Sequence, residues 1–124
     1  RSTSGVTAPS QQPAPAPVTT TVATPGMFTA AQAVRGEQRF QQACSTCHSI
    51  EEQASSLRTR WSSGTLADLF KVIATTMPQN NPGSLTSEDY ASIVAFYLRQ
   101  SGHSPGANEL PSDLTQLAKM RLAP

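Results

Sequence analysis

The sequence predicts a small all-α domain, and three observations support this prediction. Several stretches place a helix-capping residue ahead of apolar side chains that recur every three or four positions, the spacing of a helix packed on one face. No stretch alternates convincingly between apolar and polar residues, so we expect no strands. The chain has 124 residues, which is a usual length for one domain.

The first helix is expected to run from Thr29 to about Gln42. Thr29 and Gln32 have the spacing of a capping box, in which each side chain binds the other residue's free backbone N–H group. Gly36 and Phe40 follow four residues apart and therefore lie on one face of this helix.

The next two helices have clearer apolar stripes. The second is expected to begin at Thr65, with Asp68 three residues on. It should end before Pro78, because proline disfavours helical geometry in the preceding residue. The third is expected between a capping Thr86 and a terminating Gly102. Its apolar stripe consists of Tyr90, Ile93, Val94, Tyr97 and Leu98.

The C-terminal part of the chain predicts one more short helix, over residues 112–122. Leu114, Leu117 and Arg121 would align on one face of it. We treat the residues from about 103 onward as a C-terminal extension of the domain.

Residues 1–26 differ in composition from the rest and are predicted to form an extended linker. They hold five of the ten prolines, and no charged side chain occurs from Ser2 to Val34. Such a segment has too little apolar surface to fold alone and favours polyproline-like conformations. Because the chain starts at Arg1, we interpret it as a processed product. We expect the arm to tether a domain of residues 27–124 to a membrane anchor or a neighbouring domain; a disordered processed end is the alternative.

The charge pattern excludes one class of partner. Nine Lys and Arg residues are balanced by eight Asp and Glu residues, and no basic run or stripe exists. We therefore expect no nucleic-acid partner. The longest apolar stretch, Ala91 to Leu98, is interrupted by a serine and is far too short to span a bilayer. Membrane contact is expected only through the N-terminal arm.

The strongest chemical signal is the segment Cys44-Ser45-Thr46-Cys47-His48. Two thiols three residues apart, followed directly by a histidine, match the pattern of covalent haem attachment. The thiols of Cys44 and Cys47 would add to the two haem vinyl groups, and the His48 imidazole would bind the iron as proximal ligand. A redox disulfide would be expected after a strand, whereas this pair follows a helix. A zinc site needs four ligands, and only His103 remains as a further candidate.

A haem iron held by one histidine either takes a sixth ligand or stays open for chemistry. The candidate ligands are Met27, Met77, Met120 and His103. Met77 is best placed, because it ends the second expected helix and precedes a proline that stiffens its loop. Met27 lies beside the linker, and Met120 falls in the last expected helix, where a methionine usually packs. His103 follows a glycine in a loop and is expected to face solvent.

A family resemblance rests on five features taken in chain order. These are Gly36, Phe40, the Cys44–His48 motif, Met77-Pro78 and Ala95-Phe96-Tyr97-Leu98. Together they resemble a class I c-type cytochrome over about residues 27–104. In that family the first and last core helices cross at the glycine and the aromatic pair, which implies contact of Gly36 and Phe40 with Tyr97. The Trp61–Leu98 segment is similar to monohaem modules that accompany quinoprotein dehydrogenases, and similar modules are subunits of membrane redox complexes.

The resemblance also implies roles for residues around the haem. Trp61, or a nearby Arg58 or Arg60, would bind a haem propionate. One departure concerns the proximal ligand. Many family members place a proline carbonyl after the motif to accept the imidazole proton, but here no proline lies between His48 and Pro78. Another backbone carbonyl would then have to orient the ring.

These features predict a one-electron carrier with covalently bound haem c and no catalytic residues. If both axial positions are filled, the iron has no free site for a substrate. The expected partners are a redox donor and acceptor, with a quinoprotein dehydrogenase or a larger membrane complex as candidates. The expected location is the periplasm, with the arm as a tether to the inner membrane. The alternatives are a haem enzyme or sensor with an open distal site, a thiol–disulfide protein, and a structural subunit.

Overall fold

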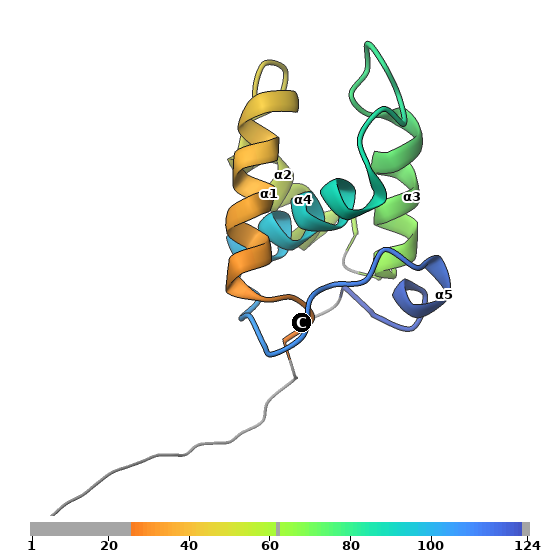
Figure 1. Ribbon diagram of the computed structural model, residues 1–124. Helices are drawn as coiled ribbons and strands as arrows, with labels where there is room; N and C mark the ends of the chain where they lie inside the picture. The colour runs from red at the N-terminus through yellow and green to blue at the C-terminus, as the bar shows by residue number, and fades with distance from the viewer. Residues whose placement is uncertain (1–25, 62, 123–124) are drawn as a thin grey trace, which may run out of the picture.

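The computed structural model describes residues 26–61 and 63–122, and it contains five helices within them. They are α1 Ala30–Ala43, α2 Ile50–Thr59, α3 Leu66–Thr76, α4 Ser87–Gln100 and α5 Leu114–Leu117. In Figure 1, α1 and α3 stand on opposite sides of α4, which crosses between them. The β pairing among the described residues is limited to one bridge between Thr65 and Arg121. The predicted all-α class is therefore confirmed, while residues 1–25 of the predicted arm lie outside the described residues.

The centre of the core is α4. Every residue from Tyr90 to Leu98 is buried, so this helix packs on all sides and not along one stripe only. Phe40 of α1 makes edge-to-face contacts with Phe96 and Tyr97, with ring centroids 5.5 and 5.9 Å apart. One turn earlier, Gly36 lets the backbone of α1 approach that of α4. These contacts fix the angle at which the two helices cross.

Two of the predicted helix starts differ in how their caps are built. At α3, which begins after Thr65 as predicted, a capping box is complete: Thr65 Oγ1 accepts the Asp68 N–H at 3.3 Å, and Asp68 Oδ2 accepts the Thr65 N–H at 3.1 Å. At α1, Thr29 Oγ1 accepts the Gln32 N–H. The prediction that the Gln32 side chain binds the Thr29 N–H is wrong. The buried Gln32 amide instead donates to the Leu110 carbonyl at 3.0 Å and accepts the Leu110 N–H at 2.7 Å. It therefore fixes the C-terminal extension against α1.

The helix α2 is not predicted by the sequence patterns. Ser49 caps it and accepts the Glu52 N–H at 3.2 Å, and its first turn carries Glu51 and Glu52, which suits the positive end of the helix dipole. Only Ala54 and Leu57 of this helix are buried. Two apolar positions are too few to produce a recognisable period.

The predicted helix over residues 112–122 is wrong in its extent. Only Leu114–Leu117 is helical. The first residue of α5 and Arg121 are exposed, whereas Leu117 is buried, so the three expected residues do not share a face. The helix ends early because the backbone that follows it pairs with the start of α3. There the Leu66 N–H donates to the Met120 carbonyl at 2.8 Å.

His103 is half-buried, and the expectation that it faces solvent is wrong. Its Nδ1 lies 3.3 Å from Ser101 Oγ, and its buried Nε2 has no hydrogen-bond partner among the described residues. Its backbone N–H donates to the Leu98 carbonyl at 2.9 Å and closes the end of α4. Gly102 precedes it with a φ of 107°, which confirms the predicted helix terminator.

Candidate functional site

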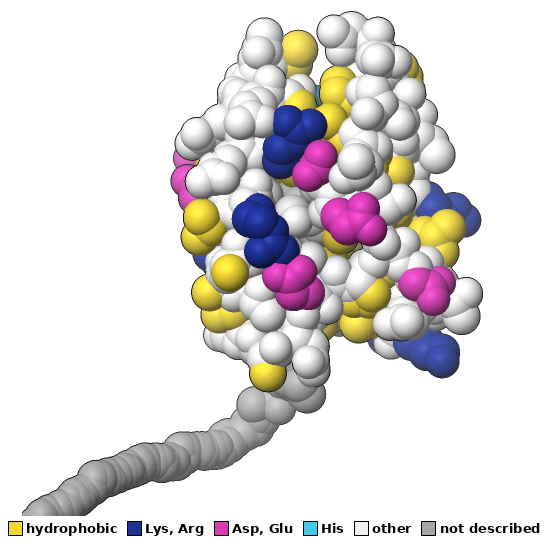
Figure 2. Space-filling view, viewed as in Figure 1, with side chains coloured by type: hydrophobic (Ala, Val, Ile, Leu, Met, Phe, Trp, Pro, Cys, Tyr) yellow, Lys and Arg dark blue, Asp and Glu magenta, His cyan; other side chains and the backbone are white. Residues whose placement is uncertain are grey.

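A cavity of about 1400 Å³ opens between the two segments that follow α1 and α3. Figure 1 shows both segments at the same end of the molecule, and Figure 2 shows the surface hollowed between them. The end of α1 and the helix α2 line one side, and the end of α3 with its following loop lines the other. All six residues singled out for a cofactor line this cavity: Cys44, Cys47, His48, Arg60, Trp61 and Met77.

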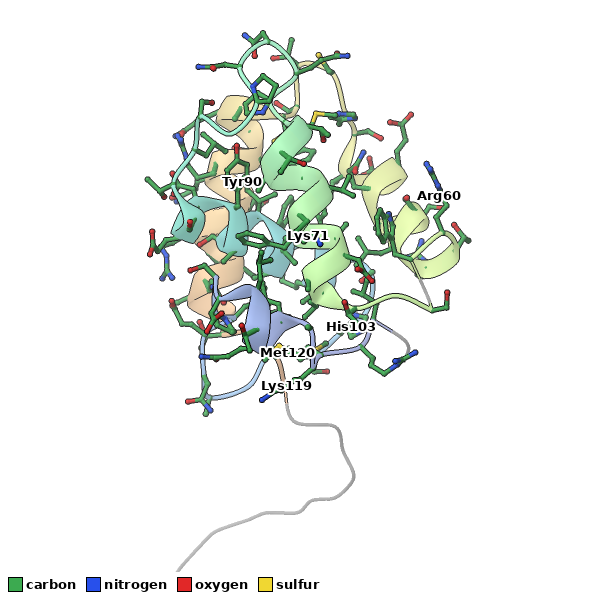
Figure 3. The ribbon with its side chains drawn as sticks, turned by 90° about the vertical axis from the view of Figure 1, so that its right-hand side faces the viewer. Arg60, Lys71, Tyr90, His103, Lys119 and Met120 are labelled. Atoms are coloured by element: carbon green, nitrogen blue, oxygen red, sulfur yellow. The ribbon has the colours of Figure 1, made fainter. Side chains whose placement is uncertain are left out.

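The other candidate iron ligands lie elsewhere. Met27, Met120 and His103 are not among the described residues that line the cavity. Met120 and His103 both lie toward the end of the molecule opposite the two loops (Figure 3). Met27 and Met120 pack against the hydrophobic core. Of the four candidate ligands, the structure therefore brings only Met77 to the motif.

The motif folds into a tight turn directly after α1. The Cys44 N–H, which caps the helix, donates to the Phe40 carbonyl at 2.8 Å. The Cys44 carbonyl then accepts the N–H groups of Cys47 and His48 at 3.1 and 3.0 Å. Cys44 and His48 are half-buried and Cys47 is exposed. This turn places both thiols and the imidazole along one wall of the cavity.

The two pKa shifts at this wall favour neutral side chains. Burial raises the pKa of the Cys44 thiol, and the guanidinium of Arg39 offsets only part of this rise. Burial also raises the pKa of the Tyr97 phenol, whose ring lines the same cavity, and nearby Cys44 adds to that effect. A thiol–disulfide protein needs a nucleophilic cysteine with a lowered pKa. The surroundings of Cys44 act in the opposite direction.

Gln53 contacts the histidine of the motif, although no sequence pattern pointed to this residue. Its Nε2 lies 3.2 Å from His48 Nδ1. Gln53 lies in the first turn of α2, is half-buried and lines the cavity. Recognising Ser49 as a helix cap would have pointed to Gln53, because the first turn of a helix that starts there brings residue 53 back toward residue 48.

Met77 ends α3, and its backbone is fixed from two sides. Its N–H donates to the Ile73 carbonyl at 2.9 Å. Its carbonyl accepts the Tyr90 hydroxyl at 2.6 Å and the Gly83 N–H at 3.4 Å. Tyr90 is buried and meets Phe70 edge to face, with ring centroids 6.3 Å apart. The core of α4 therefore determines where the methionine enters the cavity.

Trp61 and Arg60 lie at the end of α2, on the rim of the cavity. The N–H groups of both residues donate to the Ser56 carbonyl, at 3.3 Å from Trp61 and 2.8 Å from Arg60. The Trp61 side chain is half-buried and packs against the core, while Arg60 is exposed and is labelled in Figure 3. Arg58, the alternative to Arg60, is exposed and is not among the lining residues. A propionate contact for Trp61 or Arg60 stays a prediction.

The chemistry of the cavity fits a haem c. Two free thiols are available for thioether bonds, and an imidazole and a thioether on opposite sides form a known donor pair for haem iron. The apolar side chains of Leu69, Ile73 and Tyr97 contribute to the lining. The volume exceeds the roughly 300–1,000 Å³ of most small-molecule sites, as a large planar cofactor requires. Within the described residues, no group of three or more His, Cys, Asp or Glu side chains suited to a metal ion is found.

Comparisons with known proteins agree with this chemistry. The family model described as "Cytochrome C oxidase, cbb3-type, subunit III" matches residues 31–96, just over half of the 124 residues. No curated protein and no solved structure matches the chain. A cytochrome c domain implies haem c and electron transfer, suggests an electron-transfer protein and not an enzyme, and is typically periplasmic or exported. The chain therefore belongs to the cbb3-type subunit III family, a family of class I c-type cytochrome modules.

Proposed function

We propose that this chain is a one-electron carrier whose haem c is attached through Cys44 and Cys47, with His48 and Met77 as axial ligands. The observation that supports this most directly is the shared cavity, which has the motif on one wall and Met77 on the other. When bound, the haem supplies one-electron chemistry through its iron. With both axial positions filled by the chain, no coordination site is left for a substrate.

The chain's own residues would set the properties of this carrier. A methionine and a histidine together give a higher reduction potential than two nitrogen ligands. The buried side chains of Leu69 and Ile73 limit the access of water to the cavity. Arg60 on the rim offers a positive charge to the haem propionates, and Trp61 offers an indole N–H.

The first test is covalent attachment. The chain is produced in cells that mature c-type cytochromes, together with a Cys44→Ser/Cys47→Ser double variant. We expect the mass of one haem on the unaltered chain, haem staining that survives a denaturing gel, and no covalent haem on the variant. A second c-type cytochrome made in the same cells verifies that maturation works. If that control carries haem while this chain remains colourless with an unmodified mass, the proposed function is wrong.

The hydrogen bond from Tyr90 to Met77 predicts a role in holding the distal ligand. Tyr90→Phe removes the hydroxyl and keeps the ring that packs on Phe70. Losing this bond should weaken the Met77 position by about 1.4 kcal/mol, so that added imidazole replaces the methionine about tenfold more readily. Titration of the oxidised protein with imidazole, followed by absorbance, measures this.

A matched control for Tyr90→Phe is Thr75→Val. The Thr75 hydroxyl donates to the Lys71 carbonyl within α3 at 2.6 Å, so its removal costs a similar bond without touching Met77. Imidazole affinity should remain at the level of the unaltered protein in this variant. Equal affinity in the Tyr90 and Thr75 variants would show that the tyrosine does not hold the ligand loop.

The rim of the cavity predicts electron transfer that depends little on salt. Figure 2 shows Lys and Arg side chains next to Asp and Glu side chains on the body of the molecule. Arg35 pairs with Glu109, and Arg39 pairs with Asp89. The described residues around the cavity mouth are mostly uncharged. They include Gln42, Thr46, Ser55, Thr76, Gln79, Asn80, Asn81 and Ser84. The charged lining residues are Glu51, Glu52 and Arg60, which are few and of mixed sign. Electrostatic steering toward a partner is therefore weak.

We expect the second-order rate of reduction by a charged redox protein to change less than about threefold between low salt and 0.15 M. Stopped-flow absorbance at several salt concentrations measures this rate. Gln79→Lys/Asn80→Lys adds two positive charges to the same rim and should produce a clear salt dependence with an acidic donor. A dependence in the unaltered protein as steep as in this variant would contradict the prediction.

Location and partners extend the proposal. Within the described residues, none of the helices combines the length and hydropathy that a bilayer crossing requires. We propose that the protein works in the periplasm, that residues 1–26 connect it to the inner membrane, and that its donor or acceptor is a quinoprotein dehydrogenase or a membrane redox complex. Family membership supports the periplasm, and the Pro-rich composition, with no charged side chain from Ser2 to Val34, supports the tether.

A further inference from the structure

We propose that the side-chain amide of Gln53 orients the proximal imidazole by accepting the Nδ1 proton of His48. This inference rests on the proposed function, because it concerns the imidazole as an iron ligand. The sequence led us to expect a backbone carbonyl in this role. The structure instead places the Gln53 amide 3.2 Å from His48 Nδ1.

The need for an acceptor follows from the chemistry of imidazole. A neutral imidazole that binds a metal through Nε2 carries its proton on Nδ1, and that proton requires an acceptor to fix the ring. As placed, the Gln53 nitrogen faces Nδ1 of His48, which suits an imidazole whose proton is on Nε2. The oxygen and nitrogen ends of an amide have nearly the same shape, so a half-turn of the amide presents Oε1 without moving α2.

The position of Gln53 is fixed by its helix. Ser49 caps α2, and the Gln53 N–H donates to the Ser49 carbonyl at 3.3 Å. Ala54 and Leu57 are buried and anchor the helix to the core, and Leu57 lies one turn after Gln53 on the same face. Gln53 itself is half-buried, which shields its bond with His48 from part of the competing water.

Two substitutions at Gln53 should move the reduction potential in opposite directions. Gln53→Glu offers a charged acceptor, which makes the imidazole a stronger donor and favours Fe(III). Gln53→Leu removes the acceptor and favours Fe(II). At one fixed ambient potential, the ratio of oxidised to reduced protein should be about tenfold higher in the Glu variant than in the Leu variant. For a one-electron couple this ratio corresponds to about 59 mV.

Gln42→Glu is the control for the negative charge that Gln53→Glu adds to the cavity. Gln42 also lines the cavity, but the structure records its bond with Arg39 and not with His48. We expect Gln42→Glu to shift the potential less than Gln53→Glu, and Gln53→Leu to shift it upward. Equal shifts in the two Glu variants, together with an unaltered potential in Gln53→Leu, would overturn the inference.

A second measurement uses the unaltered protein. The Nδ1 proton of His48 should exchange slowly with solvent in the NMR spectrum of the reduced haem-loaded protein and at least about tenfold faster in Gln53→Leu. Equal exchange in both proteins would overturn the role of Gln53 while leaving the electron carrier intact. Absence of haem from the unaltered chain would overturn both proposals, and the attachment test identifies that case.

Discussion

Replacing Met77 by alanine is expected to lower the reduction potential of the haem-loaded protein by on the order of 0.2 V, a fraction of the about 0.8 V over which axial ligands tune haem. The thioether is the softer of the two proposed ligands, and it favours Fe(II) relative to nitrogen or water in its place. Covalent attachment should be unaffected, because Cys44 and Cys47 lie on the opposite wall. Redox titration measures the potential, and the absorption band of the sulfur–iron bond should disappear.

Met120→Ala is the matched control for this substitution. Both methionines are half-buried and pack against the same core, but Met120 lies away from the cavity (Figure 3). Its removal should cost packing energy and leave the potential and the spectrum as they are. The backbone of Met77 is fixed by Ile73 and Tyr90, so the loop should keep its place in the alanine variant.

The spectrum also decides between the carrier and a haem enzyme or sensor. If Met77→Ala leaves both the potential and the absorption spectrum unchanged, Met77 is not a ligand and the distal site is open. An open site would already bind small ligands in the unaltered protein. A new ability to bind them that arises only in Met77→Ala supports a six-coordinate iron that the chain has closed on both sides.

The parts of the site that were predictable from sequence are those set by local chemistry. The spacing of Cys44, Cys47 and His48 is a property of five consecutive residues, and the position of Met77 before a proline is equally local. The cap at Thr65 was also predictable, because Asp68 has no competing hydrogen-bond partner among the residues that the structure describes. Gln32 has the same spacing from Thr29, but it binds a backbone 78 residues away. A rule based on residues close in sequence cannot predict that a distant backbone group, here that of Leu110, binds the same amide instead.

The parts that were not predictable depend on tertiary contacts. The helix α2 buries only Ala54 and Leu57, so its helical state is determined by its cap and its place on the core more than by an apolar stripe. Because α2 was not predicted, the contact between Gln53 and His48 could not be predicted either. The short extent of α5 has the same origin, because pairing with the start of α3 competes with the helix.

Replacing Gly36 by alanine is expected to destabilise the fold by about 3 kcal/mol or more, although alanine has the higher helix propensity by about 1 kcal/mol. A Cβ atom at Gly36 would lie 1.8 Å from the Ser92 carbonyl oxygen and 2.4 Å from its carbon. Ordinary contact begins at 3.4 Å, so the backbones of α1 and α4 would have to separate by about 1.6 Å. Urea unfolding of the haem-loaded protein, followed by circular dichroism, measures the loss.

The matched control is Gly64→Ala, because a Cβ atom there would meet its nearest neighbour at an ordinary 3.5 Å. We expect that variant to stay within about 1 kcal/mol of the unaltered protein. A Gly36→Ala protein as stable as Gly64→Ala would show that α1 and α4 do not approach so closely.

Gly36→Ala should also affect the candidate haem site, because the interface between α1 and α4 positions that site. Phe40 lies one turn after Gly36, packs on Phe96 and Tyr97, and its carbonyl accepts the N–H of Cys44. Separation at the crossing would therefore displace the attachment turn relative to α4, which holds Met77 through Tyr90. Because α4 packs against both α1, which leads into the motif, and α3, which ends at Met77, we expect the folded fraction of Gly36→Ala to bind added imidazole more readily than Gly64→Ala does.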